Sequence, residues 1–289
     1  MIMIKVENVV KTFKTVPVLR NLNLEINPRE RVALVGQNGC GKTTLIRCLL
    51  GLYHFEGNIE IFDSNIKKER EEALSKIAFV PQTPPALKNT VGEIIKLTSE
   101  LCGFPATDID PVARRLGLDI SKCSSIPFKS LSGGMKQKLL IACALARKPL
   151  LLIMDEPSAN LDPQARAVFF KLLSELPVET TMLLTSHRVD ELAGIVSRVI
   201  ELDAGVITID DIVEGGESDA LTGEQICVLE LKRLPDSVKG VLQEWSFNPQ
   251  DSDGLKWEGI IPSADSFRFH ATLTRWSGII ESVTLRRKK

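Results

Sequence analysis

The chain has 289 residues, of which 44% are hydrophobic and 25% are charged. These values are close to those of average globular proteins and exclude a disordered or fibrous chain. The 36 Lys and Arg residues balance 37 Asp and Glu residues, so the formal charge of -1 excludes a global attraction to nucleic acid or acidic lipid.

The cysteines form no CxxC pair, so we expect reduced core thiols of a cytosolic protein rather than a disulfide framework or a metal site. They are Cys40, Cys48, Cys102, Cys123, Cys143 and Cys227. The amino end alternates apolar with polar residues and lacks the apolar block of a secretory signal. The longest uncharged apolar stretch, residues 139–146, is far shorter than the roughly 20 residues that cross a bilayer. We therefore expect the chain to lie outside the membrane.

The first elements read as strand, strand, strand, loop and helix. Residues 4–10 and 22–26 alternate, which predicts antiparallel strands at a sheet edge. Residues 31–35 form a short apolar strand that runs into a glycine loop. A helix over residues 43–50 follows, and Gly51 marks its end.

The middle of the chain predicts a helical insertion and two further strands. From residue 83 to 148 the pattern is helical, with prolines interrupting its first part, and no strand is indicated. Residues 150–154 and 181–185 are apolar without alternation, and the second follows a helix over residues 163–176. Such strands, alternating with helices, predict a mostly parallel sheet covered on both faces, with an antiparallel edge. The fold class is α/β.

The carboxyl-terminal part predicts a second domain. No basic residue lies between Arg198 and Lys232, and we place an acidic linker at residues 214–224 after a first domain of residues 1–213. Residues 225–289 form a small α+β domain whose element order would suit a ferredoxin-like fold. Its predicted elements are strand 226–231, helix 237–245, a short strand near Phe247, strand 255–261, helix 265–276 and strand 280–285.

A glycine-rich loop carries the strongest chemical signal. It satisfies GxxxxGK[ST], follows an apolar strand and opens a helix, which is the context that a phosphate-binding loop needs. Its glycines allow backbone N–H groups to point at phosphates, and the helix adds the positive end of its dipole. The loop consists of Gly36, Gln37, Asn38, Gly39, Cys40, Gly41, Lys42, Thr43 and Thr44.

Three residue types in and after this loop suit Mg-ATP. Lys42 should reach the β- and γ-phosphates, the hydroxyl of Thr43 should ligate Mg²⁺, and Thr44 should support the α-phosphate. The apolar strand at residues 150–154 ends in two carboxylates. We assign Asp155 to the Mg²⁺ shell and Glu156 as the general base for the attacking water.

The segment Leu131-Ser-Gly-Gly-Met-Lys-Gln137 resembles the signature loop of the ATP-binding cassette family. Further motifs resemble family elements in the family's order. They are Gln82 in Phe79-Val-Pro-Gln82 (the glutamine loop), Ser158-Ala-Asn-Leu-Asp162 (the D-loop) and His187 in Thr185-Ser-His187 (the switch histidine). The resemblance covers residues 3–213 and identifies them as a member of the family.

The resemblance implies an ATPase that works as a head-to-tail dimer, in which the signature loop of one subunit closes over the γ-phosphate held by the other. The residues expected to act across that interface are Ser132, Gly133, Gly134, Gln137 and Asp162. It also implies that Gln82 touches Mg²⁺ and the water, that His187 contacts the γ-phosphate, and that Phe13 stacks on adenine where the family more often has Tyr.

The leading hypothesis is the ATP-hydrolysing subunit of a transporter at the cytoplasmic face of the membrane, paired with a separate permease and a second cassette. Thr90-Val-Gly-Glu93 and Ser197-Arg198-Val199 resemble cassettes of export-type systems. The alternative is a soluble cassette that acts as a mechanical switch on ribosomes or DNA. Against it stand a single cassette, no long coiled-coil insertion and no basic face, so no nucleic-acid partner is expected. A small-molecule phosphotransferase would not need the segment at residues 131–137. We expect the carboxyl-terminal domain to support dimerisation or regulation.

Overall fold

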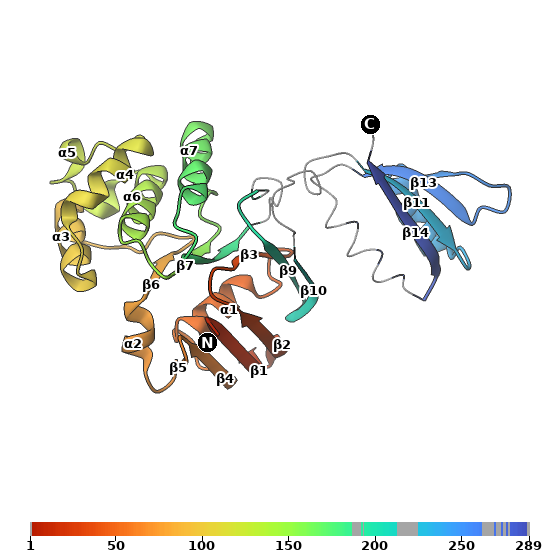
Figure 1. Cartoon of the computed structure of the whole chain (residues 1–289), viewed down its shortest axis with the longest axis horizontal. Coiled ribbons are helices and arrows are strands. Elements are labelled where there is room, and N and C mark those ends of the chain that lie inside the picture. Colours follow the sequence, from red (N-terminus) through yellow and green to blue (C-terminus); the bar gives the residue numbers. More distant parts are fainter. Residues whose placement is uncertain are drawn as a thin grey trace. The chain divides into compact units, whose positions relative to one another are not determined.

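A computed structural model describes residues 2–186, 192, 194–212, 225–261, 269, 273, 276 and 278–287. The described residues fall into two compact units. The first lies within residues 2–186 and 195–212, and the second comprises residues 192 and 194 together with those from residue 225 onward. The predicted linker at 214–224 lies outside the described residues. Figure 1 traces the chain by colour from residue 1 to residue 289.

A six-stranded mixed sheet forms the centre of the first unit. Its strand order is β10-β9-β3-β8-β7-β6, and every neighbouring pair is parallel except β9 with β10. The strands are β3 (Arg31–Val35), β6 (Ile77–Val80), β7 (Leu151–Asp155), β8 (Thr181–Thr185), β9 (Arg198–Asp203) and β10 (Val206–Ile212). The predicted α/β class, with parallel apolar strands and an antiparallel edge, is confirmed.

The two amino-terminal strands differ from the prediction in length and place. They are β1 (Ile4–Phe13) and β2 (Val16–Ile26), and they belong to a separate antiparallel sheet of order β2-β1-β4-β5, completed by β4 (Glu56–Ile61) and β5 (Ser64–Asn65). The antiparallel edge of the central sheet is supplied by β10 instead. The predicted antiparallel pairing of these two strands is confirmed. Their membership in a separate sheet was not predicted, because alternation shows that one strand face is buried but not which sheet the strand joins.

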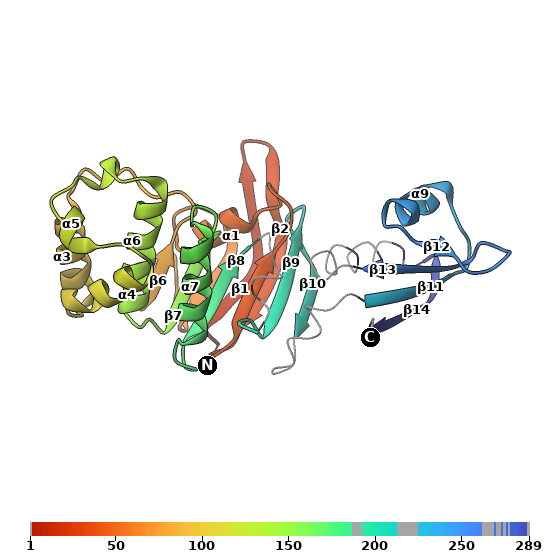
Figure 2. The same ribbon diagram turned by 90° about the horizontal axis from the view of Figure 1, so that it is seen from above.

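Helix α1 (Lys42–Leu49) fills the space between the two sheets. Leu45, Ile46 and Leu49 are fully buried in one apolar cluster that includes Ile4 of β1 and Leu34 of β3. Burial of these side chains on both sides of the helix fixes the position of its amino end, at the carboxyl end of β3. Figure 2 shows α1 beside strands of both sheets.

The predicted insertion is helical, apart from one isolated bridge between Thr90 and Pro127. In both views it forms a group beyond β6, the edge strand of the central sheet (Figures 1 and 2). Its elements are α3 (Val91–Cys102), α4 (Ile109–Arg115), α5 (Ile120–Cys123) and α6 (Gly133–Ala146), with short 3-10 turns at Ala106–Asp108 and Phe128–Ser130. Outside it lie α2 (Arg70–Ser75) and α7 (Pro163–Ser174).

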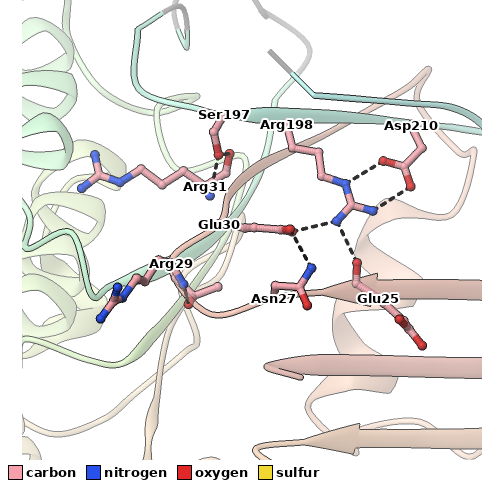
Figure 3. Close-up of polar contacts among 9 residues, drawn as sticks. Glu25, Asn27, Arg29, Glu30, Arg31, Ser197, Arg198 and Asp210 are labelled. Atoms are coloured by element: carbon pink, nitrogen blue, oxygen red, sulfur yellow. Dashed lines mark hydrogen bonds and ion pairs between the residues drawn. The ribbon is translucent and has the colours of Figure 1, made fainter. Parts of the chain in front are cut away.

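One arginine joins the central sheet to the amino-terminal sheet (Figure 3). Arg198 of β9 pairs with Asp210 of β10 at 2.6 Å and with Glu30 at 2.7 Å, and it donates to the backbone oxygen of Glu25 at 2.8 Å. Glu30 also accepts from Asn27 at 2.9 Å. These charge-assisted bonds hold the base of the β9–β10 hairpin against the end of β2.

The second unit is a four-stranded antiparallel sheet with a helix. Its strand order is β12-β13-β11-β14, and all neighbours are antiparallel. The elements are β11 (Gln225–Leu231), α9 (Asp236–Glu244), β12 (Asn248–Pro249), β13 (Lys256–Ile261) and β14 (Ile280–Arg287). Phe269 and Leu273 are helical and lie in the core of this unit. This order is the one that a split βαβ fold requires.

Within the part of the chain that the structure describes, no helix is long and apolar enough to span a bilayer.

Candidate active site

A pocket of about 310 Å³ lies at the carboxyl end of β3 in the first unit. It gathers residues from three segments that lie far apart in the sequence, and all of them were predicted site residues. They are Asn38, Gly39, Gly41, Lys42, Thr43, Thr44, Gln82 and Glu156.

The glycine loop has the backbone that its sequence predicts. Gly36 has φ +145°, and a Cβ atom there would lie 2.2 Å from the backbone oxygen of Leu202, so only glycine fits. Gly41 precedes α1 without any side-chain cap. The first N–H groups of α1 therefore remain available to an anionic ligand, together with the positive end of the helix dipole.

Lys42 is buried although it is charged, with 6% of its surface exposed. Its Nζ donates to the backbone oxygens of Gly36 at 2.7 Å and Gln37 at 3.1 Å, and lies 3.9 Å from Sγ of Cys40. Burial of an ammonium group is costly unless it is paired, and here the loop's own carbonyls pair with it. Phosphate oxygens are stronger partners than these carbonyls because they are charged.

The hairpin between β9 and β10 contacts the glycine loop. Gly205, in the hairpin turn, donates its N–H to the oxygen of Cys40 at 3.0 Å and accepts from the N–H of Arg20 at 2.9 Å. A Cβ atom on Gly205 would lie 2.2 Å from the oxygen of Val18. The turn thus ties the phosphate loop to β2, a role that the sequence did not indicate.

The two predicted carboxylates lie at the end of β7. Asp155 and Glu156 are both buried, and Glu156 has a left-handed backbone with φ 46°, which is unusual for a residue other than glycine. Thr185, at the end of β8, donates its hydroxyl to Oδ1 of Asp155 at 2.7 Å and accepts the N–H of Glu156 at 2.8 Å. Sequence reasoning missed Thr185. Its signal was a hydroxyl at the end of an otherwise apolar buried strand.

Oxygen donors of several kinds face this region, which is the chemistry that Mg²⁺ prefers. Thr43 and Gln82 line the main pocket with Glu156, whereas Asp155 lines an adjoining depression of about 420 Å³. Gln82 lines both. These oxygen donors therefore fit a hard divalent cation.

The signature residues do not line the main pocket. Ser132 caps α6 by accepting the N–H of Met135 at 3.2 Å, and Gln137 is buried and donates to the oxygen of Pro157 at 3.1 Å. A Cβ atom on Gly133 would meet nothing within 4 Å, so the loop at the start of α6 is open on that side.

Asp162 has a local role in this chain. It caps α7 by accepting the N–H of Ala165 at 2.9 Å, and it pairs with Lys138 of α6 at 2.8 Å. The hydrogen bond from Lys138 and that N–H lower the pKa of Asp162. The D-loop is therefore anchored at this end to the helix that carries the signature residues.

Phe13 is not among the residues that line the main pocket. It is 40% exposed and packs edge to face against Tyr53, with ring centroids 5.2 Å apart, and Lys11 lies 4.6 Å above its ring. The ring of Phe13 and the ammonium group of Lys11 thus lie together on the β1–β2 hairpin, but Phe13 does not line the pocket at the phosphate loop. His187 lies outside the described residues.

Comparisons with known proteins all point to the ABC transporter family. The family described as ABC transporter matches residues 19–159. The methionine import ATP-binding protein MetN of Clostridium acetobutylicum is 34% identical over 215 residues, covering 71% of this chain and 67% of that protein. The chain spans 63% of the length of MetN proteins of Francisella tularensis, which are 37% identical.

Export proteins are similar as well. The Nod factor export ATP-binding protein I of Cupriavidus metallidurans is 33% identical over 230 residues, covering 78% of this chain and 74% of that protein. The lantibiotic transport ATP-binding protein SrtF of Streptococcus pyogenes is 30% identical over 218 residues, covering 75% and 93%.

Solved structures give the same picture of the fold. The structure of an ATP-binding subunit of an ABC transporter superposes with a TM-score of 0.67 at 26% identity, covering 73% of this chain and 90% of that one. A dimeric ATP-binding cassette in a post-hydrolysis state with ADP and Pi superposes with a TM-score of 0.66 at 25% identity, covering 74% and 100%.

Proposed function

The chain belongs to the family of ABC transporter ATP-binding subunits, which hydrolyse ATP to drive transport, and from this premise we propose how its own residues do so. The observation that carries the proposal is the single pocket that joins the phosphate loop, Gln82 and Glu156. A phosphate chain, a water-positioning amide and a base are what hydrolysis of ATP requires in one place.

ATP binding begins with an exchange of partners at Lys42. Its Nζ leaves the carbonyls of Gly36 and Gln37 for the β- and γ-phosphate oxygens, while N–H groups of the loop and of α1 donate to the phosphates. Thr44 supports the α-phosphate. Phe13 would then stack on the adenine ring once the hairpin tip turns toward the loop, an assignment that rests on the resemblance alone.

Hydrolysis places a water between Glu156 and the γ-phosphorus. The carboxylate accepts a proton as the water oxygen bonds to phosphorus, and the bond from phosphorus to the bridging oxygen of ADP breaks. Gln82 orients the water, and we assign His187 to the γ-phosphate as the sequence predicts. Mg²⁺, when bound, neutralises charge on the phosphate oxygens, and Thr43, Gln82 and Asp155 would hold it.

A second subunit would complete the site. Ser132, Gly133 and Gly134 do not line the pocket of their own chain, and they open α6 with N–H groups suited to an anion. In a head-to-tail dimer they would meet the γ-phosphate of the partner, with Gln137 and Asp162 holding the adjoining segments. The similar cassette solved as a dimer with ADP and Pi supports this arrangement.

We further propose an exporter subunit at the cytoplasmic face of a membrane, bound to a separate permease. The alignment with the Nod factor export protein covers 78% of this chain, against 71% for the methionine import proteins. We assign residues 1–213 to the cassette and residues 225–289 to an accessory ferredoxin-like domain, which the strand order β12-β13-β11-β14 supports.

Phosphate release from Mg-ATP tests the hydrolytic function. Wild-type protein should convert ATP to ADP and inorganic phosphate in equal amounts, and Lys42→Ala should lower the rate by about 100-fold or more because it removes the charge that meets the γ-phosphate. Lys239→Ala, a charge removed from the exposed surface of the second unit, is the matched control. Transfer of the phosphate to an organic acceptor would instead indicate a phosphotransferase.

The same assay separates the transporter from its rival. Membrane vesicles containing the permease should stimulate hydrolysis, whereas ribosomes or DNA should leave the rate unchanged. Stimulation by ribosomes or DNA alone would favour the soluble mechanical switch.

A further inference from the structure

We propose that Thr185 is a positioning residue for hydrolysis: its single hydroxyl sets both the carboxylate of Asp155 and the backbone of Glu156. This inference rests on the proposed roles of those two carboxylates. Thr185 itself touches neither pocket, since the lining residues of both hollows exclude it.

The direction of each hydrogen bond follows from the chemistry of the groups. The N–H of Glu156 can only donate, so Oγ1 of Thr185 accepts there, at 2.8 Å. The hydroxyl has one proton, and the distance of 2.7 Å to Oδ1 of Asp155 shows where it goes. Both distances lie within the normal range for hydrogen bonds, so one hydroxyl serves both residues.

The hydroxyl of Thr185 lies in a buried environment. Thr185 is fully buried, Asp155 is 2% exposed, and they lie opposite each other in the parallel pairing of β7 with β8. Water therefore has little access to replace a lost bond. A buried oxygen or N–H that loses its partner carries the full cost of desolvation.

The contact with Glu156 acts on a strained residue. Glu156 has φ 46°, a conformation that residues with a Cβ atom rarely adopt. A backbone of this kind persists only where neighbouring contacts hold it, and the bond to Thr185 is made by the N–H of that same residue. Loss of the bond should allow the peptide to relax and carry the carboxylate of Glu156 away from the attacking water.

Strand β8 contains its own control. Thr181 lies at the opposite end of the same strand, is equally buried, and accepts the N–H of Arg29 at 2.8 Å through its hydroxyl. Thr181→Val therefore removes a bond of the same kind from the same strand, but the site at the carboxyl end stays intact. Both variants should lose stability, whereas only one should lose the chemical step.

The experiment compares Thr185→Val, Thr185→Ser and Thr181→Val in the full chain. For each we would measure kcat and KM for Mg-ATP, the half-saturating free Mg²⁺ concentration, the affinity for a fluorescent ATP analogue, and thermal unfolding. Thr185→Val should lower kcat by about 10- to 100-fold, with analogue affinity changed by less than about threefold. The half-saturating Mg²⁺ concentration should rise.

Two further variants show whether a loss of kcat comes from misplaced carboxylates or only from lower stability. Thr185→Ser restores the hydroxyl and should keep kcat within about threefold of wild type, and Thr181→Val should do the same despite a lower melting temperature. If Thr185→Val does not fold, Thr185→Cys supplies a side chain of similar size with a weak donor and should show the same loss of kcat. Equal kcat in Thr185→Val and wild type, or equal loss in Thr185→Ser and Thr185→Val, would overturn the inference.

Glu156→Gln, assayed in parallel, separates the proposed function of the site from the proposed role of Thr185. If Glu156→Gln retains full activity, the proposed function of the site fails. If Glu156→Gln is inactive while Thr185→Val hydrolyses ATP at the wild-type rate, only the inference about Thr185 fails.

Discussion

The two compact units differ in the polarity of their buried side chains. In the described residues of the second unit every buried side chain is hydrophobic, whereas the first unit buries charged and hydrogen-bonding groups. The buried polar residues of the first unit are Lys42, Ser64, Gln137, Asp155, Glu156, Thr180, Thr181, Thr185 and Ser186. Burial of such groups lowers stability unless each finds a partner.

Most of these groups gather where function is expected. Lys42, Asp155, Glu156, Thr185 and Ser186 lie at or just beyond the carboxyl ends of parallel strands, where α/β sheets bind ligands. The second unit carries no such concentration in its described part. The first unit therefore buries polar groups beside its pocket, whereas the buried side chains in the described part of the second unit are hydrophobic. Substitutions in the two units should therefore differ in their effect on hydrolysis.

Glu156→Gln should have the largest effect. It keeps the shape of the side chain but removes the base, so kcat should fall by about 100- to 10,000-fold while ATP binding persists. Phosphate release and nucleotide affinity measure the two quantities. The same change at Glu244, which is exposed in the second unit, should leave both unchanged. A Glu156→Gln protein with normal kcat would remove the base from this site.

A bulky label on Cys40 should block nucleotide binding. The thiol is buried inside the phosphate loop, 3.9 Å from Nζ of Lys42, so an added group must displace the loop or occupy the phosphate position. We expect a loss of affinity of about tenfold or more, and protection by ATP during labelling. Affinity for the fluorescent analogue is the measurement.

Four of the other thiols are poor targets for the label. Burial raises the pKa of Cys48 to about 11 and of Cys143 and Cys227 to about 12, and it raises the pKa of Cys123 as well, so these thiols stay protonated and unreactive. A Cys102→Ser background removes the partly exposed thiol. Labelled protein that still binds nucleotide normally would show that the loop is misplaced, and adding Cys40→Ser should abolish the effect.

Arg198→Met should destabilise the first unit with only a small effect on kcat. Asp210 and Glu30 hold the pKa of Arg198 above its ordinary value, so it stays charged and the contribution should not change from about pH 7 to pH 10. Loss of its bonds should lower the free energy of unfolding by about 2–3 kcal/mol, measured by denaturant titration.

An exposed pair provides the comparison. Arg115 bonds both oxygens of Glu175 on the surface, and Arg115→Met should lower the free energy of unfolding by less than Arg198→Met because water screens that pair. Equal costs for the two arginines would show that the Arg198 contacts do not hold the hairpin.

Leu242→Ala should have the smallest effect on hydrolysis. The side chain is fully buried in α9, so its loss should lower the stability of the second unit by about 2–5 kcal/mol, while kcat stays within about twofold. Leu183→Ala, equally buried in β8, should cost as much in the first unit and also lower kcat. Calorimetry and phosphate release are read together. If Leu242→Ala lowers kcat as far as Leu183→Ala does, the second unit takes part in hydrolysis.

Apolar runs were the most readable part of the sequence. The predicted bounds of β3 and β8 agree with the structure because short, fully buried strands carry little polar pattern that could mislead. The insertion was readable through its prolines. By contrast, β4, β6, β9 and β10 were not predicted. Strand β6 is short, and β10 is an exposed edge strand with acidic residues, a composition that is also typical of loops and linkers.

The sequence predicted only part of the site, because some roles depend on contacts between distant segments. The motifs predicted Lys42 and Glu156, and the pocket brings them together. The roles of Gly205 and Thr185 depend on which strands become neighbours, and the sequence order does not state this. A hydroxyl closing an apolar strand was the only local sign of Thr185.

In the proposed head-to-tail dimer, each hydrolytic site is formed by two copies of the chain, with ATP bound between them. Light scattering of purified Glu156→Gln with and without Mg-ATP tests it most directly. We expect a shift from monomer to dimer that requires Mg-ATP, and its loss when Ser132→Arg is added. A protein that remains monomeric at saturating Mg-ATP, or whose dimer survives Ser132→Arg, would contradict it.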